Sequence, residues 1–216
     1  GGGSFSKTTQ DPNIDVAGIP LYADAWRIGV SSGSPWITEH AEISRRLGKP
    51  IILGEFGVQM NRSLVYEGWL NTVINSTASG GLVWQLVYDG WKDTDGYAVS
   101  CSHDRLACDL LTSFAQLIRE RDAGALAPPS TSSLHQNFPN PFNAVTVIRY
   151  DLGSANQIEL GVYNEIGQKV ATLFDGWRTP GRYVSLFAAL GLASGVYFYS
   201  LKIAEFTETK KLIFRK

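Results

Sequence analysis

A single carboxylate occupies the position in this sequence where catalytic chemistry is most expected. Glu55 follows the apolar run Ile51 to Leu53 and stands between Gly54 and Gly57. A continuous apolar run of this length is typical of a strand buried on both faces of a parallel sheet. Because an unpaired buried carboxylate is costly, we expect Glu55 at the C-terminal mouth of that strand, where catalytic side chains collect. The alternative is a carboxylate that caps a loop or pairs with an arginine.

The segments around Glu55 alternate between strands and helices. Apolar runs predict strands, and apolar residues at helical spacing predict helices that end at glycines. The expected strands are residues 15–22, 51–55 and 82–87, and the expected helices are residues 36–47, 63–76 and 104–122. Such alternation implies parallel strands. Three units cannot close a TIM barrel, which needs eight, so we expect either a small layered α/β sheet or the end of a barrel whose beginning is missing.

From residue 134 onward the hydrophobic period changes to two, and turn residues separate short runs. This pattern predicts an all-β sandwich. The expected strands are residues 145–150, 157–163, 169–174, 183–187, 195–202 and 209–214. A Pro- and Ser-containing stretch, residues 123–133, predicts a linker ahead of this module. No pair of titratable groups in this half is placed for catalysis, so a binding or structural module is expected.

Charge and composition exclude several classes of function. The chain of 216 residues has a formal net charge of −1, which argues against a broad nucleic-acid surface. Residues 1–127 carry 10 basic and 14 acidic side chains and residues 128–216 carry 9 and 6, so the two halves differ in sign. No apolar run approaches the roughly 20 residues of a membrane span. Because the chain starts in a Gly/Ser stretch without a Met, we expect a fragment of a longer protein.

The two cysteines, Cys101 and Cys108, leave two alternatives open. They could close a small disulfide loop, which suits an extracellular protein, or they could remain buried thiols. His103 lies between them, but no second ligand pair with the spacing of a zinc site accompanies it. We therefore expect no metal site and no cofactor.

Residues 13–121 resemble the last part of the catalytic barrel of glycoside hydrolase family 5, a family of retaining β-glycosidases, and are most similar to its mannan-cleaving members. Four ordered stretches carry the resemblance, and the third is the most specific of them. They are NIDV with LYADAW at residues 13–26, WITEH at 36–40, GKPIILGEFG at 48–57 and GGLVWQL at 80–86. The resemblance implies barrel strands six, seven and eight with their helices.

The same resemblance implies a role for five side chains. Glu55 matches the nucleophile, and Tyr22 matches a tyrosine whose hydroxyl can hydrogen-bond that carboxylate. Trp84 matches the tryptophan that floors the sugar site, although core packing is its alternative role. Aromatic faces suit sugars because the C–H face of a sugar is apolar. Trp26 and Trp91 lie on loops expected at the same end and are candidates for further subsites.

Two departures from the family pattern bear on activity. Retention of configuration needs a second carboxyl group about 5–5.5 Å from the nucleophile. In the family it lies in an Asn-Glu motif after strand four, whereas Asn164 and Glu165 here lie in a turn of the second module. Pro20 occupies the position where the family usually has a histidine. We therefore expect these 216 residues alone to lack glycosidase activity.

Residues 134–216 resemble the C-terminal sorting domain of the type IX secretion system over their whole length. The stretches that carry this resemblance are QNFPNPFN at residues 136–143, TVIRY at 146–150, VYNEIGQKV at 162–170 and LASGVYFY at 192–199. The resemblance implies an immunoglobulin-like sandwich that is recognised by an outer-membrane export machine. The basic segment 210–216 is expected to form an edge strand with a cationic end; a fibronectin-type spacer without a sorting role is the alternative.

Together these patterns predict an α/β plus all-β protein. Residues 1–122 are expected to form the last three βα units of a partial TIM barrel, 123–133 a linker, and 134–216 an immunoglobulin-like β-sandwich. The predicted function is that of a secreted or cell-surface endo-β-1,4-mannanase-like glycoside hydrolase, with a plant mannan polysaccharide and the secretion machinery as partners. The alternatives are an endo-β-1,4-glucanase of the same family and a non-catalytic carbohydrate-binding or degenerate remnant. We expect a monomer that does not bind nucleic acid.

Overall fold

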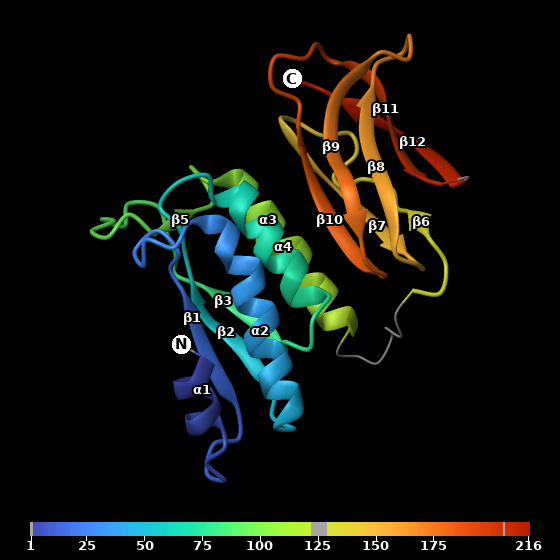
Figure 1. Ribbon diagram of the computed structural model, residues 1–216. Coiled ribbons are helices and arrows are strands. Elements are labelled where there is room, and N and C mark those ends of the chain that lie inside the picture. The colour runs from blue at the N-terminus through green and yellow to red at the C-terminus, as the bar shows by residue number, and fades with distance from the viewer. Residues whose placement is uncertain (1, 122–128, 205) are drawn as a thin grey trace. The chain divides into compact units, whose positions relative to one another are not determined.

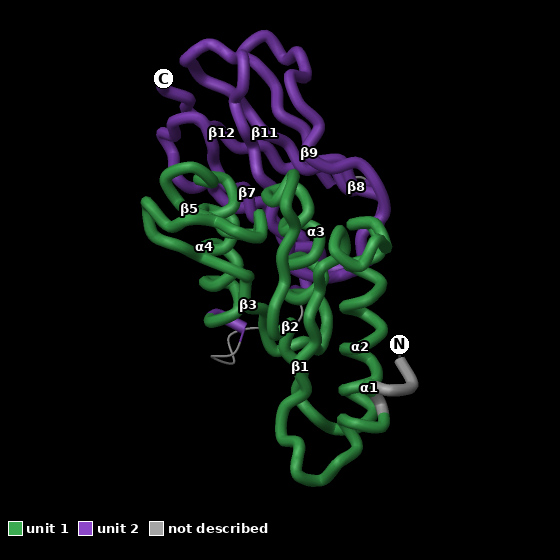
Figure 2. The backbone as a smooth tube through the Cα atoms, turned by 90° about the vertical axis from the view of Figure 1, so that its left-hand side faces the viewer, with its two compact units in different colours: residues 1–119 green, residues 120–216 purple. Residues whose placement is uncertain are grey.

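The computed structural model describes residues 2–121, 129–204 and 206–216 (Figure 1). The chain divides into two compact units, an N-terminal unit, Gly1–Arg119, and a C-terminal unit, Glu120–Lys216 (Figure 2). The linker expected at residues 123–133 lies mostly outside the described residues, and the predicted domain boundaries stay predictions. None of the helices in the described part of the chain is both long and apolar enough to cross a membrane.

The N-terminal unit is built on a three-stranded parallel sheet in the order β1-β2-β3. Its strands are β1 (Ala17–Leu21), β2 (Ile51–Phe56) and β3 (Gly80–Val83). Helix α2 (Gly33–Arg46) connects β1 to β2, helix α3 (Arg62–Ile74) connects β2 to β3, and α4 (Arg105–Glu120) follows. The alternation of strands and helices expected from the hydrophobic pattern is confirmed.

One face of this sheet is buried against the helices. Alternate residues of β1 and β2 are almost fully buried, namely Ala17, Ile19, Leu21, Ile51, Leu53 and Phe56. The Phe56 ring meets the rings of Tyr66 and Trp69 on α3 edge to face, at centroid distances of 5.0 and 6.4 Å. The residues between them are more open, and Pro20 and Glu55 are exposed. Packing of the buried face holds the sheet against its helices, while the Glu55 side chain remains accessible to solvent or a ligand.

Two expectations for this unit were wrong, and one helix was not predicted. Residues Gly2–Thr9 form helix α1, which the Gly/Ser composition did not indicate. Helix α2 begins three residues before Trp36, because Pro35 is tolerated in a first helical turn, where its missing N–H is not needed. The expected strand 82–87 is two strands, β3 and β4 (Leu86–Val87), because β3 pairs with β2 whereas β4 pairs with the unexpected strand β5 (Val99–Ser100). A short 3₁₀ turn, Val30–Ser32, precedes α2.

The C-terminal unit consists of two antiparallel sheets around one hydrophobic core. One sheet has the order β10-β7-β6 and the other β12-β11-β8-β9. The strands are β6 (Ser133–Leu134), β7 (Val145–Leu152), β8 (Asn156–Tyr163), β9 (Lys169–Arg178), β10 (Gly181–Ala188), β11 (Gly195–Ile203) and β12 (Phe206–Phe214). All six expected strands are present, and β12 is an edge strand as expected. Strand β6 was not predicted, because its two residues are too few to show a hydrophobic period. The immunoglobulin-like topology stays a prediction.

The loop at residues 136–143 covers the outer edge of β12. The Asn140 side chain accepts a hydrogen bond from the Ile213 amide at 2.9 Å and donates to the Lys211 carbonyl at 3.3 Å, as a neighbouring strand would. The Phe142 amide then donates to the Ile213 carbonyl, and the Arg215 amide donates to the Phe142 carbonyl, both at 2.9 Å. An unpaired strand edge is a template for aggregation, so this loop protects the end of the chain.

The start of α2 generates a prediction about packing. Gly33 is buried, and a methyl group added there would overlap the indole of Trp69, whose Nε1 donates to the Val30 carbonyl at 3.1 Å. We expect Gly33→Ala to lower the free energy of unfolding by about 1–3 kcal/mol, the usual cost of overpacking. Urea unfolding followed by tryptophan fluorescence measures this.

The matched control is Gly68→Ala in the interior of α3, where an added methyl group meets open space. It should stabilise the unit by about 0.5–1 kcal/mol, because alanine restricts the unfolded chain more than glycine does. Equal stabilities of the two variants would contradict the packing described at Gly33.

Candidate active site

Glu55 lies at the penultimate position of β2, at the C-terminal edge of the parallel sheet. The neighbouring strand β1 ends at Leu21, which pairs with Phe56, so that Tyr22 emerges beside Glu55. The Tyr22 hydroxyl donates a hydrogen bond to Glu55 Oε2 at 2.9 Å. Burial of the hydroxyl, and then its hydrogen bond to the carboxylate, raise the pKa of Tyr22. Tyr22 therefore stays protonated and serves as a neutral donor to an exposed carboxylate.

Trp84 directly follows β3 on the other side of Glu55. Its amide donates to the Phe56 carbonyl at 2.8 Å, and this bond continues the ladder between β2 and β3. Its indole is 40% exposed, and Nε1 donates to Asp95 Oδ2 at 3.3 Å. The indole is therefore not buried in the described core, and its role in a sugar site stays a prediction. The indole offers an open aromatic face held by one directional hydrogen bond.

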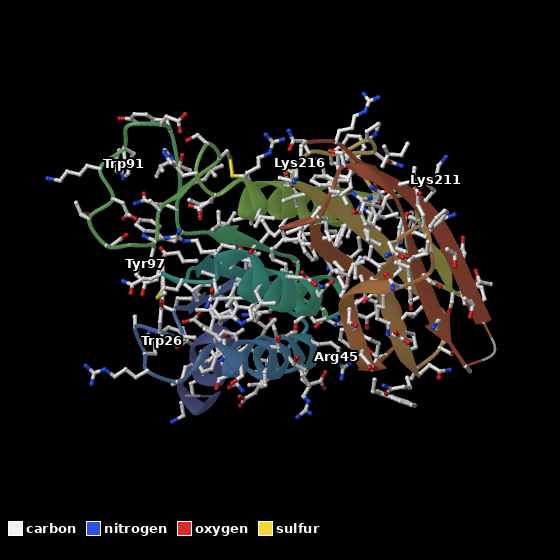
Figure 3. All side chains as sticks on the ribbon, turned by 90° about the horizontal axis from the view of Figure 1, so that it is seen from above. Trp26, Arg45, Trp91, Tyr97, Lys211 and Lys216 are labelled. Atoms are coloured by element: carbon white, nitrogen blue, oxygen red, sulfur yellow. A yellow bond between two sulfur atoms is a disulfide. The ribbon has the colours of Figure 1, made fainter. Side chains whose placement is uncertain are left out.

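The two further tryptophans expected at the site lie on loops at this same end of the unit. The Trp26 amide donates to the Tyr22 carbonyl at 2.9 Å, and its ring meets the Trp36 ring edge to face at 5.5 Å. Trp91 lies in the loop after β4 and meets the ring of Tyr88 at 5.8 Å. Figure 3 shows Trp26, Tyr97 and Trp91 on the same side of the unit. Both loop tryptophans are partly exposed, and their roles as subsites stay predictions.

Asp24 and Tyr97, which were not predicted from the sequence, connect the loops of the site. The Tyr97 hydroxyl donates to Asp24 Oδ1 at 2.9 Å, and the Gln59 amide donates to Asp24 Oδ2 at 2.8 Å. The Tyr97 ring stands edge-on to Tyr22 at 5.2 Å, with an angle of 82° between the rings. Asp24 and Tyr97 are 73 residues apart, so no local pattern could have brought them together.

The loop that carries Tyr97 is organised by two aspartates. Asp93 accepts hydrogen bonds from the amides of Asp95, Gly96 and Ala98, at 3.2, 2.9 and 3.2 Å. Asp95 accepts from the Tyr97 amide at 3.0 Å and from the Trp84 indole, and these bonds hold the pKa of Asp95 below its usual range. Gly96 has φ of 81°, a conformation that glycine adopts without strain. The short D-T-D-G run at residues 93–96 is a signal in the sequence from which this turn could have been predicted.

The disulfide between Cys101 and Cys108 settles the alternative left open for the two cysteines. It joins the residue after β5 to the first turns of α4, with 5.5 Å between the Cα atoms. This crosslink fastens the β4–β5 loop region, and with it Tyr97, to the helical layer. Disulfides persist in oxidising compartments. The residues that the structure describes contain no group of three or more His, Cys, Asp or Glu side chains placed to hold a metal ion.

Comparisons with known proteins agree with both resemblances drawn from the sequence. Residues 136–215 match the family model described as the secretion system C-terminal sorting domain. A probable mannan endo-1,4-beta-mannosidase A from Aspergillus flavus is 32% identical over 125 residues, which are 56% of this chain and 32% of that protein. Mannan endo-1,4-beta-mannosidase A from Aspergillus aculeatus is 39% identical over 83 residues, which are 38% of this chain and 22% of that protein.

A solved structure supports the fold. The endo-beta-1,4-mannanase from Thermotoga petrophila matches 98% of this chain and 49% of its own chain, with a TM-score of 0.53 and 17% identity. At this identity the likeness concerns the fold alone. The chain spans about a third or less of the length of the curated relatives it matches. The match to a sorting-domain family indicates a secreted or cell-surface protein.

The contact between Asp24 and Tyr97 generates a prediction about pH. Burial, and then the hydrogen bond to Asp24, raise the pKa of Tyr97 to about 12. The folded chain therefore binds more protons than the unfolded chain between the unfolded pKa of about 10 and this value. The stability that Tyr97 contributes is complete below pH ~10 and is lost as the pH rises toward about 12.

We expect Tyr97→Phe to flatten the alkaline loss of stability, because the group that must ionise is gone. The measurement is urea unfolding across this pH range, followed by tryptophan fluorescence, since five of the six tryptophans lie in residues 1–119. Tyr88→Phe, at a side chain that is 69% exposed, should keep the wild-type slope. Identical slopes for all three proteins would exclude the proposed proton linkage.

Proposed function

We propose that the N-terminal unit is the C-terminal part of the catalytic domain of a retaining endo-β-1,4-mannanase, with Glu55 as its nucleophile. The observation that carries this proposal is the exposed Glu55 carboxylate at the mouth of β2, which accepts a hydrogen bond from Tyr22 and lies between the ends of β1 and β3. The names of the curated relatives support mannan as the substrate class.

In the proposed mechanism, one Glu55 oxygen attacks the anomeric carbon as the leaving group is protonated by an acid. Tyr22 donates to the other oxygen and so orients the carboxylate without neutralising it. Trp84 presents an aromatic face to the apolar face of the sugar ring. As the bond between Glu55 and the sugar forms, the carboxylate loses its negative charge. A cation beside Glu55 would oppose this loss of charge more strongly than a neutral donor such as Tyr22 does.

We further propose that the acid/base lies outside this chain. The carboxylates around Glu55 are occupied: Asp24 accepts from Tyr97 and Gln59, and Asp95 accepts from Tyr97 and Trp84. A general acid needs a raised pKa, whereas that of Asp95 is lowered. Neither carboxylate is suited to protonate a leaving group, so the isolated chain is proposed to bind oligosaccharide without cleaving it.

A second candidate function is carbohydrate binding without catalysis, and Pro20 is the observation that favours it. Pro20 pairs with Glu55 in the register of β1 and β2 and is exposed beside it. A proline side chain cannot donate a hydrogen bond to a sugar or a carboxylate. Pro20, which occupies the position of the family histidine, therefore fills space beside Glu55 but supplies no hydrogen-bond donor to the site.

Sugar binding by the 216-residue chain tests both candidates. We expect mannohexaose to perturb the tryptophan fluorescence and Trp84→Ala to weaken binding about 2- to 13-fold, the equivalent of about 0.5–1.5 kcal/mol for one aromatic contact. Trp177→Ala, at a tryptophan of the C-terminal unit that is 66% exposed, is the matched control and should bind as the unchanged chain does.

Three outcomes would revise the proposal. Release of reducing ends from mannan by the chain would show that an acid/base is present after all. Tighter binding of cellohexaose than of mannohexaose would favour a glucanase. In the complete protein, Glu55→Gln should abolish mannan hydrolysis, and unchanged activity would remove Glu55 from the mechanism.

We also propose that the C-terminal unit directs the protein to the outer-membrane secretion machinery. The match over residues 136–215 and the excess of basic over acidic side chains in residues 128–216 support this role. In the closing segment Lys210 pairs with Glu208 at 3.0 Å, whereas Lys211, Arg215 and Lys216 have no ion pair with a carboxylate of the described residues. Those three exposed cations are available to a partner.

Deletion of residues 134–216 from the complete protein should retain the enzyme in the periplasm of a host with this secretion system. Cell fractionation with an immunoblot measures the location, and protease resistance of the periplasmic material shows that the truncated protein is folded. Normal secretion after the deletion would contradict the sorting role and leave a structural spacer.

A further inference from the structure

We propose that Asp24 is a positioning residue of this site: through Tyr97 it holds Tyr22 where its hydroxyl donates to Glu55. The inference rests on the proposed function for its meaning in catalysis. The contacts that carry it belong to the N-terminal unit itself.

Asp24 joins three loops that follow three different strands. It comes after β1, its Oδ2 accepts from the Gln59 amide after β2, and its Oδ1 accepts from the Tyr97 hydroxyl in the loop between β4 and β5. Its Oδ1 also accepts from the Ala25 amide at 2.9 Å. The side chain is half-buried, and both oxygens are used. A carboxylate whose two oxygens both accept hydrogen bonds has little freedom to move, so it can hold the three loops at fixed positions relative to one another.

Tyr97 transmits this constraint to Tyr22. Its ring is 9% exposed and stands edge-on to the Tyr22 ring at 5.2 Å. A methyl group added at Gly57 would lie 2.8 Å from Tyr97 Cδ1, 2.9 Å from the Trp84 carbonyl oxygen and 3.3 Å from Tyr22 Cε1. The two rings and the end of β2 therefore pack without spare room. If Tyr97 moves, Tyr22 gains room and its hydrogen bond to Glu55 loosens.

Asp24 acts through other side chains and not on the sugar site itself. Within the described residues, its carboxylate accepts hydrogen bonds from the Tyr97 hydroxyl and from the amides of Ala25 and Gln59, and it has no hydrogen bond with Glu55. Asp24 therefore determines where the Tyr22 hydroxyl stands, and Tyr22 in turn donates to the proposed nucleophile. The effect of replacing Asp24 is predicted to appear at Tyr22, two contacts away, and this separates positioning from a purely local structural role.

NMR of the full 216-residue chain, labelled with ¹³Cζ-tyrosine, tests the proposal without any substrate. The nine tyrosines give nine signals, and Tyr22→Phe and Tyr97→Phe assign the two that matter. Glu55→Ala removes the acceptor and defines the position of the Tyr22 signal when its hydrogen bond is lost. Asp24→Ala should move the Tyr22 signal more than half of the way to that position. Tyr97→Phe, which keeps the ring but loses the bond to Asp24, should move the Tyr22 signal in the same direction.

The matched control is Asp15→Ala, because Asp15 is an exposed aspartate that precedes β1, whereas Asp24 follows it. It should leave the Tyr22 signal unchanged. A wild-type Tyr22 signal in a folded Asp24→Ala variant would overturn the proposal, and if that variant does not fold, a wild-type Tyr22 signal in Tyr97→Phe would overturn it equally. These outcomes are independent of sugar binding, so the proposed function can fail while the positioning role holds, and the reverse.

Discussion

The site depends on the pairing of three parallel strands at one register. Leu21 pairs with Phe56, Phe56 pairs with Val83, and the residues that follow or flank these positions are Tyr22, Glu55 and Trp84. Because parallel strands all end at the same edge of a sheet, three residues from distant parts of the sequence meet there. The burial of Phe56 against Tyr66 and Trp69 holds the central strand on its helix. A slip of one residue would turn each of these side chains to the opposite face.

The loops beyond the strand ends are held mainly by carboxylates that accept hydrogen bonds. Asp24 binds donors from two other loops, Asp93 binds three amides of its own turn, and Asp95 binds the Trp84 indole. Hydrogen bonds to charged groups are stronger than those between neutral groups, so short irregular segments can be kept in place by few contacts. The disulfide between Cys101 and Cys108 adds a covalent link between the end of β5 and α4. Glu55 is exposed like Asp93 and Asp95, and it accepts a hydrogen bond from the Tyr22 hydroxyl.

In the C-terminal unit, the unpaired edge of the last strand, β12, is covered by a loop. An amide side chain has the same donor and acceptor as a peptide group, so Asn140 can stand in for a neighbouring strand along β12. The buried Asn137 supports the loop by donating to Thr146 Oγ1 at 2.9 Å. The loop and β12 are separated by some 70 residues, and a motif that looks like a local turn in the sequence is in fact a long-range contact.

The sequence by itself determined the order of strands and helices, the position of Glu55 at a strand mouth and the all-β character of the second half. These follow from hydrophobic period and from the cost of burying a charge, which are local properties. Resemblance added Tyr22 and Trp84. Only the tertiary structure decided four further features. They are the separation of β4 from β3, the disulfide between the two cysteines, the loop 136–143 that covers the edge of β12, and the contact between Asp24 and Tyr97. The two cysteines are only seven residues apart, and their spacing did not decide whether they form a disulfide. The other features depend on which separate segment supplies a partner, and a hydrogen bond between residues 24 and 97 leaves no periodic trace along the chain.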